Sequence, residues 1–346
     1  MRAAVFHENG GPEVVSVEEV ETPTPAPGQV LVAVGASSFN HLDLWVRRGL
    51  PIETPMPHIG GSDIAGTVAA VGSEADDPWV GKRVVVDPSL SYRWYELAGL
   101  SGRGEAPISE FTQFTVIGEH TQGGFAEFVV VPTENLVELP SHVPFQTAAA
   151  AALTGVTALR GLLSRGQLEA GESVLITGAS GGVASIAIQI AKLTGTTVHA
   201  LTSSDENMER VRGLGADFAY DRRNDDWSKA LYEQTGRRGV NLCLDSVGEA
   251  IWPQAMRALA VGGRIVSYGA TAGHKASFDI RALFWRQLSI LGSTMGTHVE
   301  FRRAMSLVFE GRIAPVVHTV LPLDEAARGH EILEAGGVFG KIVLEP

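Results

Sequence analysis

A glycine-rich turn between a strand-like run and a helix-like run most constrains what this chain can fold into. The stretch SVLITGASGGVA covers residues 173–184, and its apolar run is Val174–Ile176. Apolar residues then recur at helical spacing, at Val183, Ile186, Ala187, Ile190 and Ala191. A second apolar run follows at 197–201. This order predicts a strand, a turn, a helix and a parallel strand, which is the first unit of a doubly wound sheet.

The chemistry of the turn indicates a phosphate site. Gly178, Gly181 and Gly182 keep side chains out of the turn, so a phosphate can approach the backbone. The free N–H groups at the start of the following helix then bind it. Glycines at such spacing also occur in ordinary turns, but the flanking strands and helix favour a nucleotide site. We therefore expect a dinucleotide cofactor and redox chemistry.

Length and charge limit the possible partners. A chain of 346 residues is long enough for two domains. The formal net charge of −12 repels nucleic acid and anionic membranes, so we expect neither as a partner. Cys243 lies in an apolar run and is expected to be an inert buried thiol. Residues 1–6 resemble a strand rather than a secretory signal, and we expect a cytoplasmic protein.

The pattern of elements changes near residue 141. Before it, short apolar or alternating runs predict strands of a small, partly closed β barrel, at 3–6, 14–17, 30–34, 64–71, 84–86 and 125–131. After it, strands (173–177, 197–201, 240–245, 264–268 and 288–291) alternate with helices (183–193, 205–213 and 250–259). Such alternation predicts a parallel sheet with helices on both faces. The tail, with helices near 300–310 and 323–335 and a strand at 341–344, is expected to return to the first domain.

Several segments in this order resemble the medium-chain dehydrogenase/reductase superfamily. They are PHIGGSDIAGTVAAVG (57–72), IGEHTQGGFAEFVVVP (117–132), ITGASGGVA (176–184), LGAD (214–217), DSVG (245–248), RQLSILGSTM (286–295) and FGKIVLEP (339–346). The resemblance implies an α/β chain. A GroES-like β-barrel catalytic domain would occupy 1–140 and 298–346, and a Rossmann dinucleotide-binding domain 141–297. It also implies a homodimer or homotetramer.

The residues at the metal positions of zinc-containing members differ here. The catalytic zinc ligands of those enzymes are matched by Asn40, Ser62 and Leu153, and Asp63 follows the second of them. An amide, a hydroxyl and an apolar side chain do not make a zinc site. The resemblance therefore implies an enzyme without catalytic zinc. A replacement site built on His41, His58 and His120 is the less favoured alternative.

The segment 88–124 matches the lobe that holds a structural zinc in the same enzymes. Its cysteine positions are matched by Ser91, Trp94, Leu97 and Glu105. We expect apolar packing to replace the metal, through Tyr92, Trp94, Tyr95, Leu97 and Phe111.

The resemblance to zinc-free members also indicates the substrate class. Hydride addition to an isolated ketone builds a full alkoxide charge, which a Lewis acid stabilises. In a quinone or an enone the charge spreads by conjugation, and a hydrogen-bond donor suffices. Asn40 is expected to contact the substrate oxygen, and Asp43 to orient its neighbours or to be a structural acceptor. The proton donor stays open among Ser62, His41, Tyr92 and water.

Residues after the second strand of the parallel sheet bear on cofactor choice. Thr202 and Ser203 stand where NAD-specific sites carry an acid, which favours NADPH, with NADH possible. Asn207 replaces a common lysine, so Arg222 or Arg223 would have to face the 2′-phosphate. Further contacts implied by the resemblance are Thr157 to the nicotinamide, Lys341 to the pyrophosphate, and Gly178, Ser180, Gly181, Gly182, Val183, Tyr220, Ser246, Val247, Gly269 and Ala270 along the cofactor.

Three functions stay open at this point. The first is a zinc-independent, NAD(P)H-dependent reductase of a conjugated carbonyl, acting on a small molecule. The second is a zinc-free alcohol or aldehyde dehydrogenase. The third is a non-catalytic nucleotide-binding protein with a structural or regulatory role, since a fold alone does not select among them.

Overall fold

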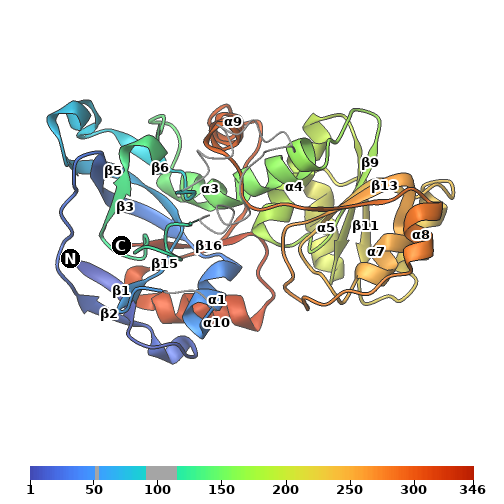
Figure 1. Cartoon of the computed structure of the whole chain (residues 1–346), viewed down its shortest axis with the longest axis horizontal. Coiled ribbons are helices and arrows are strands. Elements are labelled where there is room, and N and C mark those ends of the chain that lie inside the picture. The colour runs from blue at the N-terminus through green and yellow to red at the C-terminus, as the bar shows by residue number, and fades with distance from the viewer. Residues whose placement is uncertain (51–53, 91–114) are drawn as a thin grey trace. The chain divides into compact units, whose positions relative to one another are not determined.

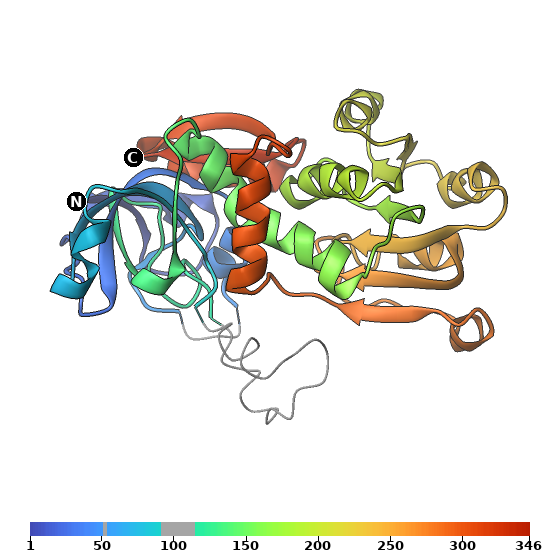
Figure 2. The same cartoon turned by 90° about the horizontal axis from the view of Figure 1, so that it is seen from above.

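The computed structural model describes residues 1–50, 54–90 and 115–346, without the side chain of Ala75. The chain divides into two compact units (Figures 1 and 2). Unit 1 contains Met1–Val156 and Gly296–Pro346, and unit 2 contains Thr157–Met295. The expected lobe residues Ser91, Trp94, Leu97 and Glu105, with Tyr92, Tyr95 and Phe111, lie outside the described residues.

Unit 2 is built on a parallel sheet whose strand order is β11-β10-β9-β12-β13-β14. The strands are β9 (Ser173–Ile176), β10 (Thr197–Thr202), β11 (Phe218–Asp221), β12 (Val240–Asp245), β13 (Leu259–Ser267) and β14 (Ser289–Gly292). Every neighbouring pair in this sheet is parallel. The order reverses between β9 and β12, which is the point where doubly wound sheets bind ligands. The expected α/β fold class is confirmed.

Helices cover the sheet of unit 2 because each has one apolar face. They are α4 (Gly182–Leu193), α5 (Asp205–Gly213), α6 (Trp227–Gln234), α7 (Trp252–Ala258) and α8 (Ile280–Trp285). Trp227 and Leu231 of α6 pack with Leu175 and Leu201 of the sheet in one buried cluster. Ser204 caps α5 by accepting the N–H of Asn207 at 3.1 Å. The sequence pattern did not predict β11, α6 or α8.

Unit 1 contains, among its described residues, a larger and a smaller sheet. The larger has the order β15-β16-β3-β5-β6-β8, with β7 also on β3, and the smaller has the order β2-β1-β4. The strands are β1 (Arg2–Phe6), β2 (Ser16–Glu19), β3 (Gln29–Ser38), β4 (His58–Ile59), β5 (Asp63–Val71), β6 (Arg83–Val86), β7 (Phe128–Pro132), β8 (Leu136–Glu138), β15 (Val317–Pro322) and β16 (Lys341–Glu345). Because β16 pairs antiparallel with β3, the tail joins the first part of the chain as expected.

Unit 1 also contains helices and short 3₁₀ turns. They are α1 (His41–Arg48), α3 (Phe145–Leu159, continued as a π-helical turn over Arg160–Arg165), α9 (His298–Phe309) and α10 (Ala326–Ala335). Short 3₁₀ turns lie at Pro12–Val14 (η1), Glu74–Trp79 (η2), Thr133–Asn135 (η4) and Leu323–Glu325 (η6). Asn40 caps α1 reciprocally with Asp43. This capping box fixes the start of α1 beside the end of β3.

The boundary between the units lies inside α3, later than the expected boundary after residue 140. The physical reason is that the first half of α3 is bonded to unit 1. The N–H of Leu153 donates to Asp63 at 2.7 Å, and the carbonyl of Ala149 accepts from Ser38 at 3.3 Å. The second boundary, after Met295, lies close to the expected one.

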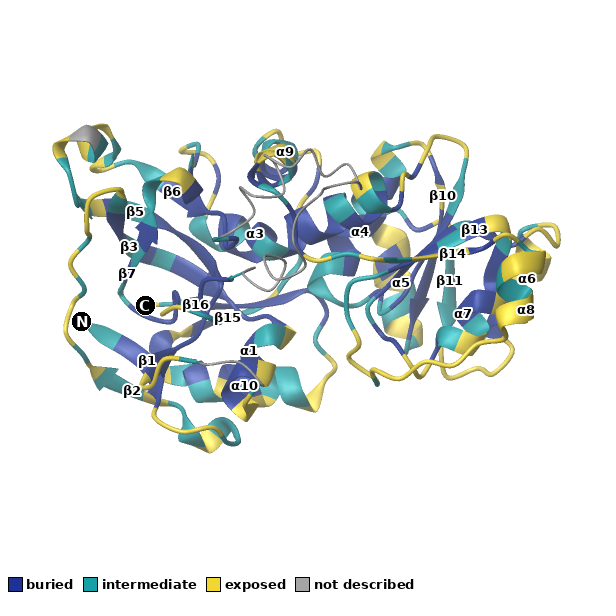
Figure 3. Cartoon of the chain, in the orientation of Figure 1, coloured by how far each residue is buried: buried dark blue, intermediate teal, exposed yellow. Residues whose placement is uncertain are grey.

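Two features of the core bear on the expectations from composition. The segment Phe145–Arg165 is long and apolar enough to cross a membrane, but 72% of its most apolar window is buried inside the structure. It therefore fits a core helix. Cys243 is fully buried, and burial raises the pKa of its thiol well above the usual range. Figure 3 shows that the central strands of the unit 2 sheet are buried, whereas the surface of α8 is exposed.

Candidate active site

The turn after β9 forms an open cradle at the carboxyl edge of the unit 2 sheet. Gly178 has a φ of +55°, and a Cβ there would lie 2.9 Å from the Oγ of Ser246. Gly181 is the N-cap of α4 and forms no side-chain cap, so the first N–H groups of α4, from Gly182 and Val183, have no intrahelical partner. A side chain would fill this cradle, whereas a phosphate would fit it.

Asp245, at the end of β12, holds the neighbouring loop in place. Its carboxylate accepts the hydroxyl of Thr177 at 2.6 Å and the indole N–H of Trp252 at 2.7 Å. It also accepts the N–H groups of Val247 at 3.0 Å and Gly248 at 3.1 Å. This network places the backbone of Ser246–Gly248 beside the cradle.

The end of β10 presents polar groups at the same edge. Thr202 is buried, and its Oγ1 has no partner among the described residues. The N–H of Arg222 donates to the carbonyl of Thr202 at 2.7 Å. Arg223, in contrast, binds the half-buried carboxylate of Asp221 with two nitrogens at 3.0 and 2.6 Å. The side chain of Arg223 is therefore already engaged by Asp221, while the backbone of Arg222 is held beside Thr202.

The structure brings most of the expected cofactor residues to this edge. The cradle and the ends of β10, β12 and β13 carry Gly178, Ser180, Gly181, Gly182, Val183, Thr202, Ser203, Ser246, Val247, Gly269 and Ala270. Asn207 lies in the first turn of α5, and Thr157 is buried in the last turn of α3.

Two expected cofactor contacts have other partners. The hydroxyl of Tyr220 lies 3.0 Å from Nδ1 of His199, two positions toward the amino end of the sheet. Lys341 belongs to unit 1, and its ammonium bonds Asp63 at 2.9 Å and Oδ1 of Asn40 at 2.5 Å. Packing against His199 on the sheet face sets the orientation of the Tyr220 side chain, and attraction to the buried carboxylate of Asp63 sets that of Lys341. The contacts to a nucleotide that the resemblance implies for them stay predictions.

A second polar cluster lies in unit 1, around the fully buried carboxylate of Asp63. One oxygen accepts the hydroxyl of Ser38 at 2.7 Å, the amide of Asn40 at 2.9 Å and the ammonium of Lys341 at 2.9 Å. The other accepts the N–H of Leu153 at 2.7 Å. Both ends of the Asn40 amide are therefore engaged, which leaves it one N–H.

Asp43 acts here through the backbone. It accepts the N–H of Asn40 at 2.6 Å and the N–H of Gly61 at 3.0 Å, and so positions the two segments that carry Asn40 and Ser62. Burial raises the pKa of Asp43 to about 6, although these two hydrogen bonds and Lys341 act in the opposite direction.

Glu119 is an acidic neighbour that the sequence analysis missed. Burial, with a smaller contribution from Asp43, raises its pKa to about 7. It follows Gly118, where a Cβ would lie 2.7 Å from the backbone of Gly61. The sequence shows a glycine in each of the two segments, but not that they approach each other, so nothing in it pointed to Glu119.

Ser62 is the polar group of this cluster that remains unused. It is fully buried, and its hydroxyl has no partner in the described ranges of the chain. His41, at the start of α1, is exposed at the surface, although partial desolvation of its ring and the charge of Lys341 lower its pKa. Ser62 directly precedes Asp63 in the chain, so the cluster has a buried hydroxyl donor without a partner among the described residues.

Comparison with known proteins bears on both clusters. The family described as "Alcohol dehydrogenase GroES-like domain" matches residues 26–141, and the family described as "Zinc-binding dehydrogenase" matches residues 182–310. A solved structure titled NAD-dependent alcohol dehydrogenase is 38% identical, with a TM-score of 0.92 and full coverage of both chains. The chain belongs to the medium-chain dehydrogenase/reductase superfamily. It is an NAD(P)-dependent oxidoreductase of that family.

Other relatives of this chain have names that give different substrates. Human quinone oxidoreductase is 28% identical, over 99% of this chain and 97% of its own. A solved 2-octenoyl-CoA carboxylase reductase, in complex with NADP and 2-octenoyl-CoA, is also 28% identical. Its TM-score is 0.85, and the match covers 96% of this chain and 82% of that one.

The two cofactors of the superfamily fit this dehydrogenase/reductase differently. A nicotinamide dinucleotide fits unit 2, because the cradle at Gly178 excludes a side chain and the buried hydroxyl of Thr202 has no partner in the part of the chain that the structure describes. The positions that the resemblance matches to catalytic zinc ligands include Asn40 and Ser62, and an amide and a hydroxyl do not suit zinc. Where the chain is described, we find no group of three His, Cys, Asp or Glu side chains that could hold a metal ion.

Proposed function

We propose that this enzyme transfers hydride from NAD(P)H to a conjugated carbonyl, a quinone or an enone, without zinc. The observation that carries the proposal is the polar cluster in unit 1. Asn40 and Ser62, which the resemblance matches to zinc ligands, supply an amide and a hydroxyl donor there, and the ammonium of Lys341 is bonded to Asn40. Hydrogen-bond donors of this kind can stabilise a delocalised negative charge. They stabilise the full charge of an isolated alkoxide less well than a metal ion does.

Each part of the chain has a separate task in this reaction. The bound dinucleotide supplies the hydride. The N–H groups of Gly182 and Val183 bind its pyrophosphate at the start of α4, assisted by the helix dipole. The hydroxyl of Ser62 donates to the substrate oxygen as negative charge develops there, and the remaining N–H of Asn40 is a second donor.

Ser62 is a stronger candidate than Asn40 for this hydrogen bond. The Asn40 amide already donates one N–H to Asp63 and accepts from Lys341 at its oxygen, so only its second N–H can bond the substrate. Ser62 has no such commitments within the described structure, and an unpaired buried hydroxyl is costly unless a ligand satisfies it. Asp43 is a positioning residue that holds both segments by their backbones.

Steady-state assays test the proposal directly. The purified enzyme is assayed with NADPH and NADH against a quinone, an enone and a simple aldehyde, and its zinc content is measured after dialysis. We expect turnover with the conjugated acceptors and less than a tenth of a zinc per chain. Ser62→Ala should lower kcat at least tenfold while leaving the Kd for NADPH unchanged. A tightly bound zinc, or turnover with the aldehyde only, contradicts the proposal.

A zinc-free alcohol or aldehyde dehydrogenase is the second candidate. It is favoured by the similarity to the structure titled NAD-dependent alcohol dehydrogenase. Oxidation of alcohols by NADP⁺ or NAD⁺ without metal would identify it. The third candidate, a non-catalytic nucleotide-binding protein, predicts tight NADPH binding with no turnover of any of these substrates.

We also propose that NADPH is preferred over NADH. The end of β10 carries Thr202 and Ser203 rather than an acid, and Arg222 is anchored there by its backbone. An arginine pairs well with a 2′-phosphate. Arg222→Gln should therefore raise the KM for NADPH severalfold and leave the KM for NADH unchanged. Equal effects on both would contradict the assignment.

A small molecule is the proposed partner, together with a second copy of this chain. The edge strand β14 offers unpaired backbone groups, and Ile280, Phe284 and Trp285 of α8 are exposed beside it. Two copies joined at this edge would cover both features. Light scattering of the eluted protein distinguishes a homodimer or homotetramer from a monomer. A cytoplasmic location, with neither membrane nor nucleic acid as partner, remains part of the proposal.

A further inference from the structure

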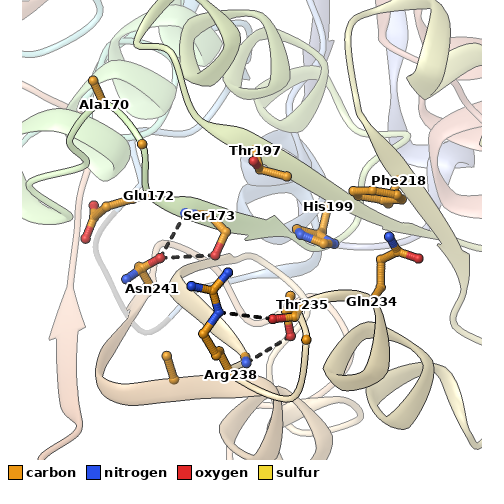
Figure 4. Close-up of a pocket in the computed structure, with 14 residues that line it drawn as sticks. Ala170, Glu172, Ser173, Thr197, His199, Phe218, Gln234, Thr235, Arg238 and Asn241 are labelled. Carbon is orange, nitrogen blue, oxygen red and sulfur yellow. Dashed lines mark hydrogen bonds between the residues drawn. The ribbon is translucent and has the colours of Figure 1, made fainter.

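A hollow lies at the amino ends of the unit 2 strands, at the edge opposite the phosphate cradle (Figure 4). Its volume is about 600 Å³, which is in the range of small-molecule sites. The first residues of β9, β10 and β11, which are Ser173, Thr197 and Phe218, contribute to its wall. A strand of four residues separates the two edges by about 13 Å. The hollow is therefore distinct from the nucleotide site.

The polar side chains of this hollow are arranged as donors. The Oδ1 of Asn241 accepts both the N–H of Ser173 at 2.9 Å and its hydroxyl at 3.1 Å, which fixes the orientation of the amide. The NH₂ end of Asn241 forms no hydrogen bond within the described structure and could donate to a ligand. Arg238 donates its Nε to the carbonyl of Thr235 at 3.3 Å, which leaves the two terminal nitrogens of the guanidinium. Figure 4 shows Arg238 extending between Asn241 and Thr235.

The balance of charge around the hollow is positive. Glu172 also lines it, but Arg264 neutralises that carboxylate with two bonds at 2.9 and 2.6 Å. Arg238 has no ion-pair partner within residues 1–50, 54–90 and 115–346. The carbonyls at the end of α6 disfavour an anion, but Arg238 is bonded to one of them and offsets this effect.

One wall of the hollow is aromatic. The rings of His199 and Phe218 lie 5.0 Å apart and are nearly parallel, at 23°. Burial lowers the pKa of His199 to about 4, so its ring is neutral at pH 7. The hydroxyl of Tyr220, which does not line the hollow, lies 3.0 Å from Nδ1 of His199 and helps to fix that ring. His199 and Phe218 therefore give the hollow a flat aromatic wall rather than a second charge.

We propose that this hollow binds a small planar carboxylate, with the carboxylate on Arg238 and Asn241 and the planar part along Phe218. A cation and an amide donor on one side suit a carboxylate, because its two oxygens accept from both. An aromatic wall suits a flat apolar group. The site belongs to the nucleotide-binding unit and does not depend on the substrate proposed for unit 1.

Benzoate is the probe for this site. Its binding to the full chain is measured by calorimetry at saturating NADPH, so that the nucleotide edge is filled. We expect saturable binding at one site per chain. Arg238→Gln should weaken it at least tenfold, and benzamide, which has the same shape without the charge, should bind at least tenfold more weakly than benzoate. Phe218→Leu should weaken benzoate severalfold.

Arg237→Gln is the matched control, because Arg237 is exposed next to Arg238 but pairs with Glu233 at 3.1 Å. It should leave benzoate binding unchanged, and both arginine variants should retain the wild-type Kd for NADPH, which also shows that they fold. The absence of saturable benzoate binding overturns the proposal. Equal binding by wild type and Arg238→Gln, or loss of binding on addition of NADPH, overturns it as well.

Discussion

Replacing Asp63 by asparagine tests the account of the unit 1 cluster most directly. Four donors converge on its carboxylate, from Ser38, Asn40, Lys341 and the backbone of Leu153, at 2.7 to 2.9 Å. Asparagine has nearly the same size but carries no charge and accepts at one end only. The variant therefore leaves the buried ammonium of Lys341 without its counter-ion. Its NH₂ group also faces a hydrogen-bond donor that the carboxylate oxygen had accepted from.

The structure sets the size of the expected effect. Both members of the Asp63–Lys341 pair are buried, with side-chain exposures of 0% and 4%. Breaking one partner of such a pair costs about 3–5 kcal/mol. The lost acceptor adds about 1 kcal/mol. A unit of this size shifts its Tm by about 2–4 °C per kcal/mol, so we expect a fall of roughly 10 °C or more.

Calorimetry of four variants separates charge from hydrogen bonding. Lys341→Met alone should cost about as much as Asp63→Asn, since each strands one buried charge. The double variant should lose less than the sum of the two, because no charge is then left unpaired. Ser38→Ala removes one neutral donor and should cost about 1 kcal/mol. Additive costs in the double variant, or an Asp63→Asn protein as stable as wild type, would refute the reasoning.

Further predictions concern other parts of the chain. Because burial and Asp43 raise the pKa of Glu119 to about 7, the folded state takes up a proton that the unfolded state has already lost, and stability falls as pH rises from about 4.5 to 7. Glu119→Gln should remove this fall, of at most about 3 kcal/mol, in urea titrations at pH 5 to 8, and a pH-independent difference from wild type would contradict it. Gly178→Ala should raise the Kd for NADPH at least tenfold, since a Cβ at φ +55° meets Ser246, and unchanged nucleotide binding in a fluorescence titration would contradict the cradle. Cys243 should resist maleimide in the native protein and react once urea unfolds it, and rapid native labelling would show that its surroundings open.

The parallel sheet could be predicted because its central strands are strongly apolar and end in distinctive turns. Val174–Ile176 is followed directly by the glycine turn, and Val240–Asp245 by the DSVG segment. Strand β11 gave no such signal, because its four residues Phe218–Asp221 are all half-buried and show no alternation. Helix α6 has eight residues, with no acid in its first turn and no base in its last, and the side chain of its N-cap residue Asp226 forms no capping bond. Its formation therefore depends on the packing of Trp227 in the core.

The part of the candidate site in unit 2 could be predicted from the order of strands, whereas Asn40, Asp43 and Ser62 of unit 1 were indicated only by the family resemblance. Residues that end neighbouring parallel strands meet at one edge, which brings Gly178, Thr202 and Ser246 together. The cluster of unit 1 joins Asp63 to Lys341 across 278 positions, and no local pattern reports such a contact. The side chain of Tyr220 likewise depends on its packing with His199, which a family resemblance does not determine.

The Asp245 network has a consequence for how the cofactor arrives. The backbone of Val247 and Gly248 is already held by that carboxylate, so the loop spends no entropy on ordering when a dinucleotide docks. Association should therefore proceed in a single kinetic phase, without a slow rearrangement of this loop. Amide hydrogens at these two residues should exchange with solvent at the same slow rate in the apo and the NADPH-loaded enzyme.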